Sequence, residues 1–171
     1  MNECSKKLYH SLLAWQEWAG GAEQHESGWE SDAPNWEELI GNAQELLLSG
    51  ELLSNDLSNI EKVLSISEEG EVLADFIKEN LGNIHKLNIR RLLGSSDTQV
   101  RWQVYDSLVA PNEFCRELLR EGTLDPDDYV RRRAFLRLMA IEKPAEYILK
   151  RALTDSDQVI RDEATRLLAD S

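Results

Sequence analysis

Three stretches spaced 30 residues apart decide the fold: DTQVRWQVYDSL at 97–108, DDYVRRRAFLRL at 127–138 and DQVIRDEATRLL at 157–168. Their apolar positions recur every four residues, which places those side chains on one face of a helix. The chain therefore contains three equivalent helices that bury the same face. The shared columns are Asp97, Asp127 and Asp157; Val100, Val130 and Ile160; Arg101, Arg131 and Arg161; Val104, Ala134 and Ala164; and Leu108, Leu138 and Leu168.

Each of these stretches begins with residues that favour a helix start. The clusters at 95–97, 125–127 and 155–157 read Ser-Ser-Asp, Asp-Pro-Asp and Asp-Ser-Asp. Ser and Asp side chains accept hydrogen bonds from free N–H groups at a helix N-terminus, and Pro suits the first helical position. A second, shorter helix is predicted between the stretches, because Phe114, Leu118 and Leu119 match Pro144, Ile148 and Leu149 with the same shift of 30. Residues 83–94 would supply the earlier partner helix.

The unit is thus a helix, a turn and a helix, and such a pair cannot bury its apolar face without stacked neighbours. The pattern Asp-x-x-Val-Arg-x-x-Ala-x-x-x-Leu resembles the HEAT-repeat superfamily, especially its short members of roughly 30 residues. This resemblance covers residues 83–171 and implies an all-α protein, an α-solenoid of HEAT-like helical hairpins. It also implies that the repeated Asp and Arg form a structural ladder between successive units, a role carried onto Asp97, Arg101, Asp127, Arg131, Asp157 and Arg161.

The repeat becomes weaker toward the N-terminus, where three further amphipathic helices are predicted at 3–18, 36–48 and 54–65. Divergent terminal units are expected in a solenoid, since its end must present a polar outer face. The sequence therefore predicts one domain over 1–171, with a divergent helical N-terminal cap at 1–80 and three units of period 30 at 81–171. Residues 19–35, which contain three Gly, one Pro, four acids and no base, are predicted to form a long loop.

The net charge is concentrated in one half of the chain. The protein has 19 Lys and Arg against 32 Asp and Glu, a net charge of −13. Residues 1–80 hold 17 acids and four bases and carry all of that charge, whereas residues 81–171 hold 15 of each. Nucleic acids and anionic membranes both require a cationic face, so neither is an expected partner.

The sequence shows no catalytic, cofactor or metal motif. His10, His25 and His85 match no metal-ligand spacing, and Gly20-Gly21 lacks the context of a phosphate-binding loop. Cys4 and Cys115 form no CxxC pair or disulfide framework, which favours a reducing, cytoplasmic location. No apolar run approaches the ~20 residues that span a bilayer. We therefore expect no enzyme activity and no cofactor; a HEAT-like lyase or glycosylase would be the enzymatic alternative.

Two surfaces are candidates for binding a protein. The first combines carboxylates with aromatic anchors, a composition suited to a basic partner; its residues are Glu23, Glu26, Trp29, Glu30, Asp32, Trp36, Glu37 and Glu38. The second lies beside the ladder on the concave helix face, where charge is mixed, and contains Trp102, Tyr105, Arg132 and Arg133. A solvated network of ion pairs is the alternative interpretation of the arginine run at 131–133.

These features predict a protein inhibitor that docks on a basic partner. A small, acidic helical-repeat protein without catalytic groups resembles, more distantly, the helical HEAT-like immunity proteins of bacterial contact-dependent inhibition systems. That resemblance implies a toxin inhibitor, a monomer that forms a heterodimer with a nuclease-type toxin and occludes its active site. The alternative is a HEAT-like scaffold or adaptor that holds a protein or peptide on the concave helix face.

Overall fold

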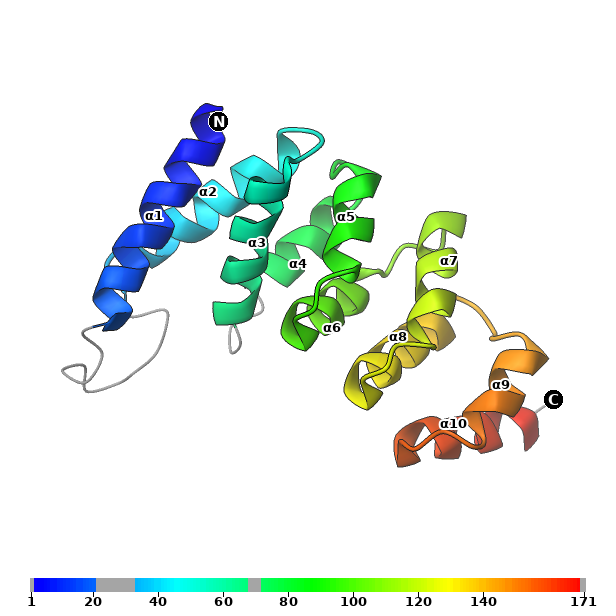
Figure 1. The fold of residues 1–171 in the computed structure, drawn as a ribbon. Helices are drawn as coiled ribbons and strands as arrows, with labels where there is room; N and C mark the ends of the chain where they lie inside the picture. The colour runs from blue at the N-terminus through cyan, green and yellow to red at the C-terminus, as the bar shows by residue number, and fades with distance from the viewer. Residues whose placement is uncertain (1, 21–32, 68–71, 170–171) are drawn as a thin grey trace. The chain divides into compact units, whose positions relative to one another are not determined.

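A computed structural model describes residues 2–20, 33–67 and 72–169, and over these ranges the chain consists of helices and turns without any strand (Figure 1). The all-α prediction is confirmed. The helices are α1 (Glu3–Gly20), α2 (Trp36–Leu48), α3 (Ser54–Ile66), α4 (Val72–Asn80), α5 (Lys86–Leu93), α6 (Thr98–Ser107), α7 (Glu113–Gly122), α8 (Asp128–Ile141), α9 (Glu146–Ala152) and α10 (Gln158–Ala169).

The helix predictions at the N-terminus agree closely with α1, α2 and α3. Helix α1 continues to Gly20, so the first two residues of the predicted loop at 19–35 are helical. No helix in the described ranges has the length and hydropathy needed to cross a bilayer.

The chain divides into two compact units, Met1–Val100 and Arg101–Ser171, with the boundary inside α6. The sequence predicted one domain with its change of character at residue 80. The two boundaries differ because the first reflects packing and the second reflects charge. Unit 1 has 18 acidic and seven basic residues, a net charge of −11, and unit 2 has 14 acidic and 12 basic residues, a net charge of −2.

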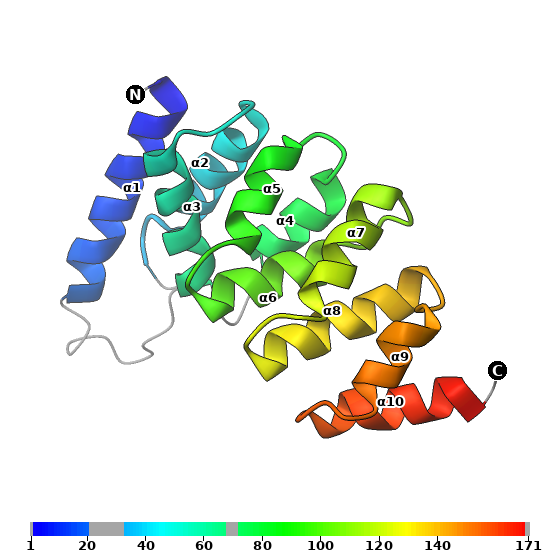
Figure 2. The same cartoon turned by 45° about the vertical axis from the view of Figure 1, so that its right-hand side comes forward.

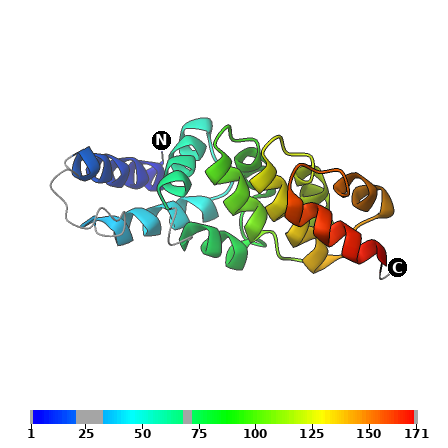
Figure 3. The same ribbon diagram turned by 90° about the horizontal axis from the view of Figure 1, so that it is seen from below.

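In unit 1 successive helices from α1 to α4 pack on one another, and α1–α3, α2–α4 and α3–α5 contacts join helices that are next but one. Helix α2 contacts α1, α3 and α4, and α3 contacts α1, α4 and α5. The close pairing of α1 with α2 is visible in Figure 3. The core comes from the amphipathic faces read from the sequence, and its fully buried side chains include Leu8, Leu39, Leu46, Leu47, Ile60 and Leu64.

A buried amide fixes the turn between α2 and α3 to α5. Asn88 is fully buried; its Nδ2–H donates to the Gly50 carbonyl at 2.7 Å, and its Oδ1 accepts from the Leu52 N–H at 3.0 Å. Gly50 has a φ of 113°, a left-handed conformation that favours glycine. Because Asn88 satisfies two main-chain groups of this turn, the turn is anchored without a regular secondary structure of its own.

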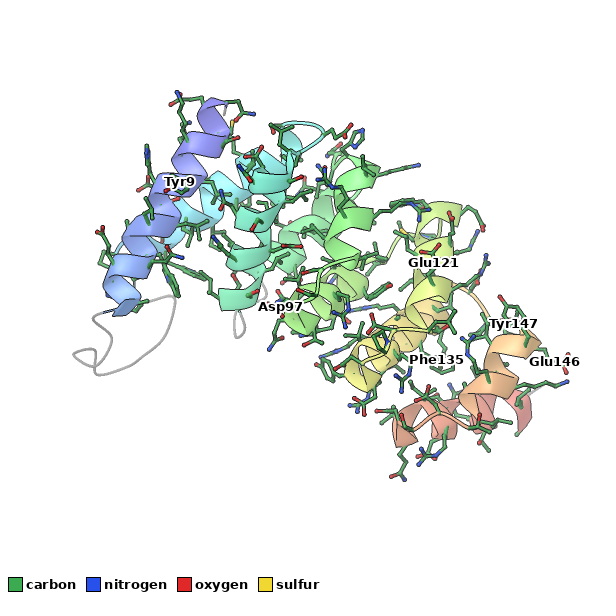
Figure 4. All side chains as sticks on the ribbon, viewed as in Figure 1. Tyr9, Asp97, Glu121, Phe135, Glu146 and Tyr147 are labelled. Carbon is green, nitrogen blue, oxygen red and sulfur yellow. The ribbon has the colours of Figure 1, made fainter. Side chains whose placement is uncertain are left out.

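Unit 2 is built from two short hairpins. Helix α7 packs on α8, α9 packs on α10, and α10 also packs on α8 (Figure 2). The repeated columns form its core, since Val130, Ala134 and Leu138 are fully buried. Phe135 and Ile148 are each only 1% exposed. Figure 4 marks Phe135 on α8.

The aspartates at the starts of the repeated helices cap them, as the sequence predicts. Oδ1 of Asp127 accepts from the Val130 N–H at 3.1 Å, and Oδ1 of Asp157 accepts from the Ile160 N–H at 3.1 Å. In the first copy Asp97 accepts from the Gln99 N–H at 2.9 Å. Each cap satisfies an N–H group that has no partner within its helix.

Substitution by alanine is expected to have opposite effects on stability at two glycines. A Cβ at Gly122 would lie 2.5 Å from the Tyr105 ring and 2.7 Å from the Ala134 Cβ, whereas a Cβ at Gly41, inside α2, would meet nothing within 4 Å. We expect Gly122→Ala to lower the free energy of unfolding by about 1–3 kcal/mol through overpacking. Gly41→Ala should raise it by about 0.5–1 kcal/mol. Urea denaturation followed by circular dichroism measures both; an unchanged stability for Gly122→Ala would contradict the close packing of α7 on α6 and α8.

Candidate protein-binding site

A repeated arginine clamp joins the successive copies of unit 2. Arg131 donates from Nε and Nη2 to the two carboxylate oxygens of Asp155, at 3.0 and 2.9 Å, and from Nη1 to the carbonyls of Asp125 and Pro126. Arg101 donates to the Asp125 carboxylate from the same two groups, at 2.8 and 2.9 Å. Such bidentate, charge-assisted pairs are among the stronger hydrogen-bonded contacts in proteins.

The structure places the acidic partner of this clamp two residues before the predicted column. Arg101 and Arg131 reach Asp125 and Asp155 of the following copy, while Asp127 and Asp157 cap helices. The reason is local geometry: the carboxylates of Asp125 and Asp155 each also accept the N–H two positions on, which aims them at the arginine. Asp97 accepts from the Ser65 hydroxyl instead.

The clamp is incomplete at the last copy. Nη1 of Arg161 donates to the carbonyls of Asp155 and Ser156, at 2.7 and 2.8 Å, which repeats the main-chain half of the Arg131 arrangement. Within the described residues Arg161 has no carboxylate partner. Arg161 and Arg131 therefore form a natural comparison, because they share their main-chain contacts and differ in the ion pair.

Arginine and aromatic side chains gather on α6 and α8 into one group, here called the arginine–aromatic cluster: Trp102, Tyr129, Arg132 and Arg133. The Trp102 and Tyr129 rings meet edge to face with centroids 5.6 Å apart. The guanidinium of Arg133 lies 5.2 Å from the Trp102 centroid and 5.0 Å from the Tyr129 centroid, and that of Arg132 lies 5.5 Å from Tyr129. At these distances the guanidinium groups are attracted to the ring faces, and this cation–π interaction holds the arginine side chains in place.

Two carboxylates balance most of the cluster's charge. Arg132 donates to Asp157, whose side chain is 4% exposed. Asp106 accepts two hydrogen bonds from Arg137 and also lies 3.7 Å from Arg133. Burial opposes the ionisation of Asp157, but hydrogen bonds from Arg132 and the Ile160 N–H lower its pKa overall. Arg132 and Arg133 keep about a third of their side-chain surface exposed. The cluster is thus a preorganised surface of Arg, Trp and Tyr, the residue types enriched at binding hot spots.

Tyr105 does not belong to this surface. It is 6% exposed, its ring packs against Gly122, and burial raises the pKa of its hydroxyl to about 12. Trp102 is also largely covered, at 8% exposure, so it supports Arg133 and offers a partner little surface. Of the four residues predicted for the concave face, Arg132 and Arg133 remain accessible.

The acidic candidate surface falls only partly in the described residues. Glu23, Glu26, Trp29, Glu30 and Asp32 lie outside them. Trp36 begins α2 and is half-buried, and Glu37 and Glu38 follow it with exposed side chains. The approach to α2 is held against α1, because Nδ2–H of Asn35 donates to the Ser11 carbonyl at 2.7 Å.

The two units differ in how their carboxylates are compensated. In unit 2, ion pairs hold Asp106, Asp125, Glu142, Asp155 and Asp157. In the described part of unit 1, ion pairs hold Glu45, with Lys7 at 3.4 Å, and Asp75, with Lys78 at 3.8 Å. Exposed carboxylates of that part that make no ion pair with another described residue are Glu3, Glu17, Glu37, Glu38, Glu51 and Glu79. Unit 1 therefore presents uncompensated negative charge.

Among the described residues no group of three or more His, Cys, Asp or Glu side chains is arranged to hold a metal ion. Comparison with family models, curated proteins and solved structures gives no match to this chain. The site therefore has to be interpreted from its own geometry.

Sequence reasoning identified the arginines but missed two of their partners. Tyr129 lies four residues before Arg133, so the two share a helix face, and its hydroxyl accepts from Arg133 Nε at 3.0 Å. The sequence pattern assigns Asp155 only to a cluster at a helix start. The repeat itself contains a signal for this partner, because Asp125 and Asp155 occupy equivalent positions 30 residues apart. In the first copy that position is Ser95.

The incomplete clamp predicts unequal costs for two equivalent substitutions. Arg131→Met removes a pair whose side chains are only 15% and 14% exposed, and leaves the Asp155 carboxylate without its partner. We expect it to lower the free energy of unfolding by about 3 kcal/mol. Arg161→Met should cost about 1 kcal/mol, since only hydrogen bonds to carbonyls are lost. Urea denaturation distinguishes the two, and equal costs would contradict a stabilising role for the carboxylate half of the clamp.

The clamp also predicts how stability depends on pH. Hydrogen bonds from Arg131 are the main cause that lowers the pKa of Asp155. A lowered folded-state pKa contributes stability that is fully present above the unfolded value, about 3.9, and is lost as the pH falls through the folded value. The difference in unfolding free energy between wild type and Asp155→Asn should therefore be constant from pH 7 to about pH 5 and shrink below it. Exposed Asp162→Asn is the control, and a difference that persists unchanged at the lowest pH at which both proteins fold would refute this assignment.

Proposed function

We propose that this chain is a protein-binding inhibitor, a helical solenoid whose acidic unit docks on a basic protein. The observation that supports this proposal is the uncompensated charge of unit 1, where exposed carboxylates such as Glu37 and Glu38 have no ion pair within the described residues. Charge of one sign destabilises a compact domain through self-repulsion. A basic partner would relieve that repulsion, and the attraction between opposite charges would strengthen binding.

The proposed mechanism is electrostatic steering followed by occlusion. Unit 1, with a net charge of −11, would attract a cationic surface, and its carboxylates would substitute for the phosphates that such a surface binds. Trp36, half-buried at the start of α2, would supply an apolar anchor beside Glu37 and Glu38. A nuclease-type toxin has a cleft of this kind, which makes an immunity protein in the bacterial cytoplasm the specific form of the proposal.

Packing supports the solenoid part of the proposal. In each unit helices contact the next but one, as in α3 with α5 and α8 with α10. The arginine clamp repeats with the period of the sequence, from Arg101 to Arg131. Stacked helical pairs that each rely on a neighbour for their core are the defining feature of solenoids.

The test begins with affinity capture of the partner from the source organism and its identification by mass spectrometry. Association of the purified pair is then measured by stopped flow at increasing ionic strength. We expect the rate constant to fall about tenfold or more between low and high salt, because steering is screened. Glu37→Gln/Glu38→Gln should slow association at low salt, whereas Asp128→Asn/Asp162→Asn, which removes two exposed carboxylates from unit 2, should leave it nearly unchanged.

An association rate indifferent to salt and to the Glu37 and Glu38 substitutions would refute steering by unit 1. Capture of many unrelated proteins would favour the second candidate, a scaffold or adaptor. The arginine–aromatic cluster favours that candidate, because Arg132 and Arg133 are partly exposed and are held in place by the aromatic rings. In that case Arg133→Gln would abolish binding and the substitutions in α2 would not.

A further inference from the structure

Helices α9 and α10, at one end of unit 2 (Figure 2), carry the arginine clamp that is incomplete. Nη1 of Arg161 donates to two main-chain carbonyls at 2.7 and 2.8 Å, as Nη1 of Arg131 does at 2.9 and 3.1 Å. Nε and Nη2 of Arg131 hold the Asp155 carboxylate. The same two groups of Arg161, here called its unpaired edge, make no hydrogen bond or ion pair with another described residue.

The two preceding copies show which chemical group fits this edge. In both, Nε and Nη2 of an arginine meet the two oxygens of one carboxylate, in Arg101 with Asp125 and in Arg131 with Asp155. The planar guanidinium matches a carboxylate in this bidentate manner. Since Arg161 has the same place in the repeat and the same main-chain contacts as Arg131, its unpaired edge has the geometry of a carboxylate site.

The surface beside the unpaired edge is uncovered as well. Thr123 follows α7 and is 6% exposed, and Arg151 of the next copy donates to its hydroxyl at 2.6 Å. Leu153, 30 residues on, is 38% exposed. Leu138 is fully buried, whereas its equivalent Leu168 is half-buried. The face that α9 and α10 cover in one copy is therefore open in the next, where it carries aliphatic side chains.

The covered junction shows what a partner has to supply. A small cavity there is lined by Arg131 and Phe135 of α8 and, from the copy that follows, by Ile148, Asp155 and Ile160 among others. Asp155 lies in the turn before α10, and its carboxylate also accepts a main-chain N–H of that turn, which fixes its direction. The complement of the clamp is thus a helical segment with a carboxylate at a helix start and aliphatic residues around it.

One difference in the repeat limits how much apolar surface a partner can bury. Tyr105 and Phe135 occupy equivalent positions and are 6% and 1% exposed, whereas the third copy has Thr165, which is exposed. A polar outer face is what the terminal unit of a solenoid requires. Binding at this end therefore depends mainly on the pairing of Arg161 with a carboxylate.

We propose that the α9–α10 end of unit 2 binds a helical segment of a protein partner through a carboxylate. An aspartate or glutamate at a helix start of the partner pairs with Nε and Nη2 of Arg161, and aliphatic side chains of the partner cover Leu153 and Leu168. A free anion gains only the ion pair, whereas a helical segment also removes these leucines from water, which favours a protein as the source of the carboxylate. The site uses no carboxylate of unit 1, so it goes beyond the proposed inhibition.

Nuclear magnetic resonance of the isotope-labelled chain tests whether the unpaired edge accepts a carboxylate. Sodium acetate is titrated against sodium chloride at equal ionic strength, and the Nε–H signal of each arginine is followed. We expect the Arg161 signal, assigned by its loss in Arg161→Lys, to shift and saturate. The Arg131 signal should stay in place, because Asp155 already occupies its Nε. Exposed Arg151, which makes no ion pair within the described residues, is the matched control, and an Arg161 response no larger than that of Arg151 overturns the proposal.

A lengthened chain tests whether a helical segment is the source of the carboxylate. One further copy of residues 142–171 is joined after Ser171, which keeps the period of 30. The appended equivalent of Asp155 should fill the unpaired edge and weaken the apparent affinity of Arg161 for acetate about tenfold or more, and asparagine at that one appended position should restore it. An unchanged acetate response would overturn docking of a helical segment and leave a free carboxylate as the ligand. Loss of steering by unit 1 would alter none of these results, so the two proposals fail separately.

Discussion

The architecture of unit 2 depends on the arginine clamp, in which one guanidinium satisfies two main-chain carbonyls of its own copy and the carboxylate of the next. Arg131 does so with Asp125, Pro126 and Asp155. This contact recurs with the 30-residue period of the sequence, from Arg101 with Asp125 to Arg131 with Asp155. The buried columns then fall into register, with Val130, Ala134 and Leu138 fully covered.

The clamp also explains the different electrostatic character of the two units. Because the arginines of unit 2 are used internally, their charge and that of their aspartates largely cancel, and the two arginines of the arginine–aromatic cluster keep only about a third of their side-chain surface exposed. Unit 1 has no arginine before Arg90. Its core is held by apolar contacts, and the turn between α2 and α3 is held by the Asn88 amide and by Arg91, which donates to the Leu52 carbonyl and the Ser54 hydroxyl. Its carboxylates are therefore left to face solvent, where a basic partner can meet them.

Sequence reasoning recovered the helices because their signal is periodic and local. It placed α2 from Trp36 to Leu48 and identified the aspartates that cap the repeats, both of which depend only on neighbouring residues. It did not identify Asp155 as the partner of Arg131, because that contact crosses 24 positions and depends on the aim of a turn.

In the proposed mechanism a basic protein binds unit 1 through the start of α2 and the residues before it. Hydrogen exchange of the chain with and without its captured partner, read by mass spectrometry of peptides, tests this most directly. Added protection is expected to concentrate in residues 19–38, with α6 and α8 unchanged. Protection confined to α6 and α8, where Arg132 and Arg133 are partly exposed, would contradict binding through α2 and assign it to the arginine–aromatic cluster.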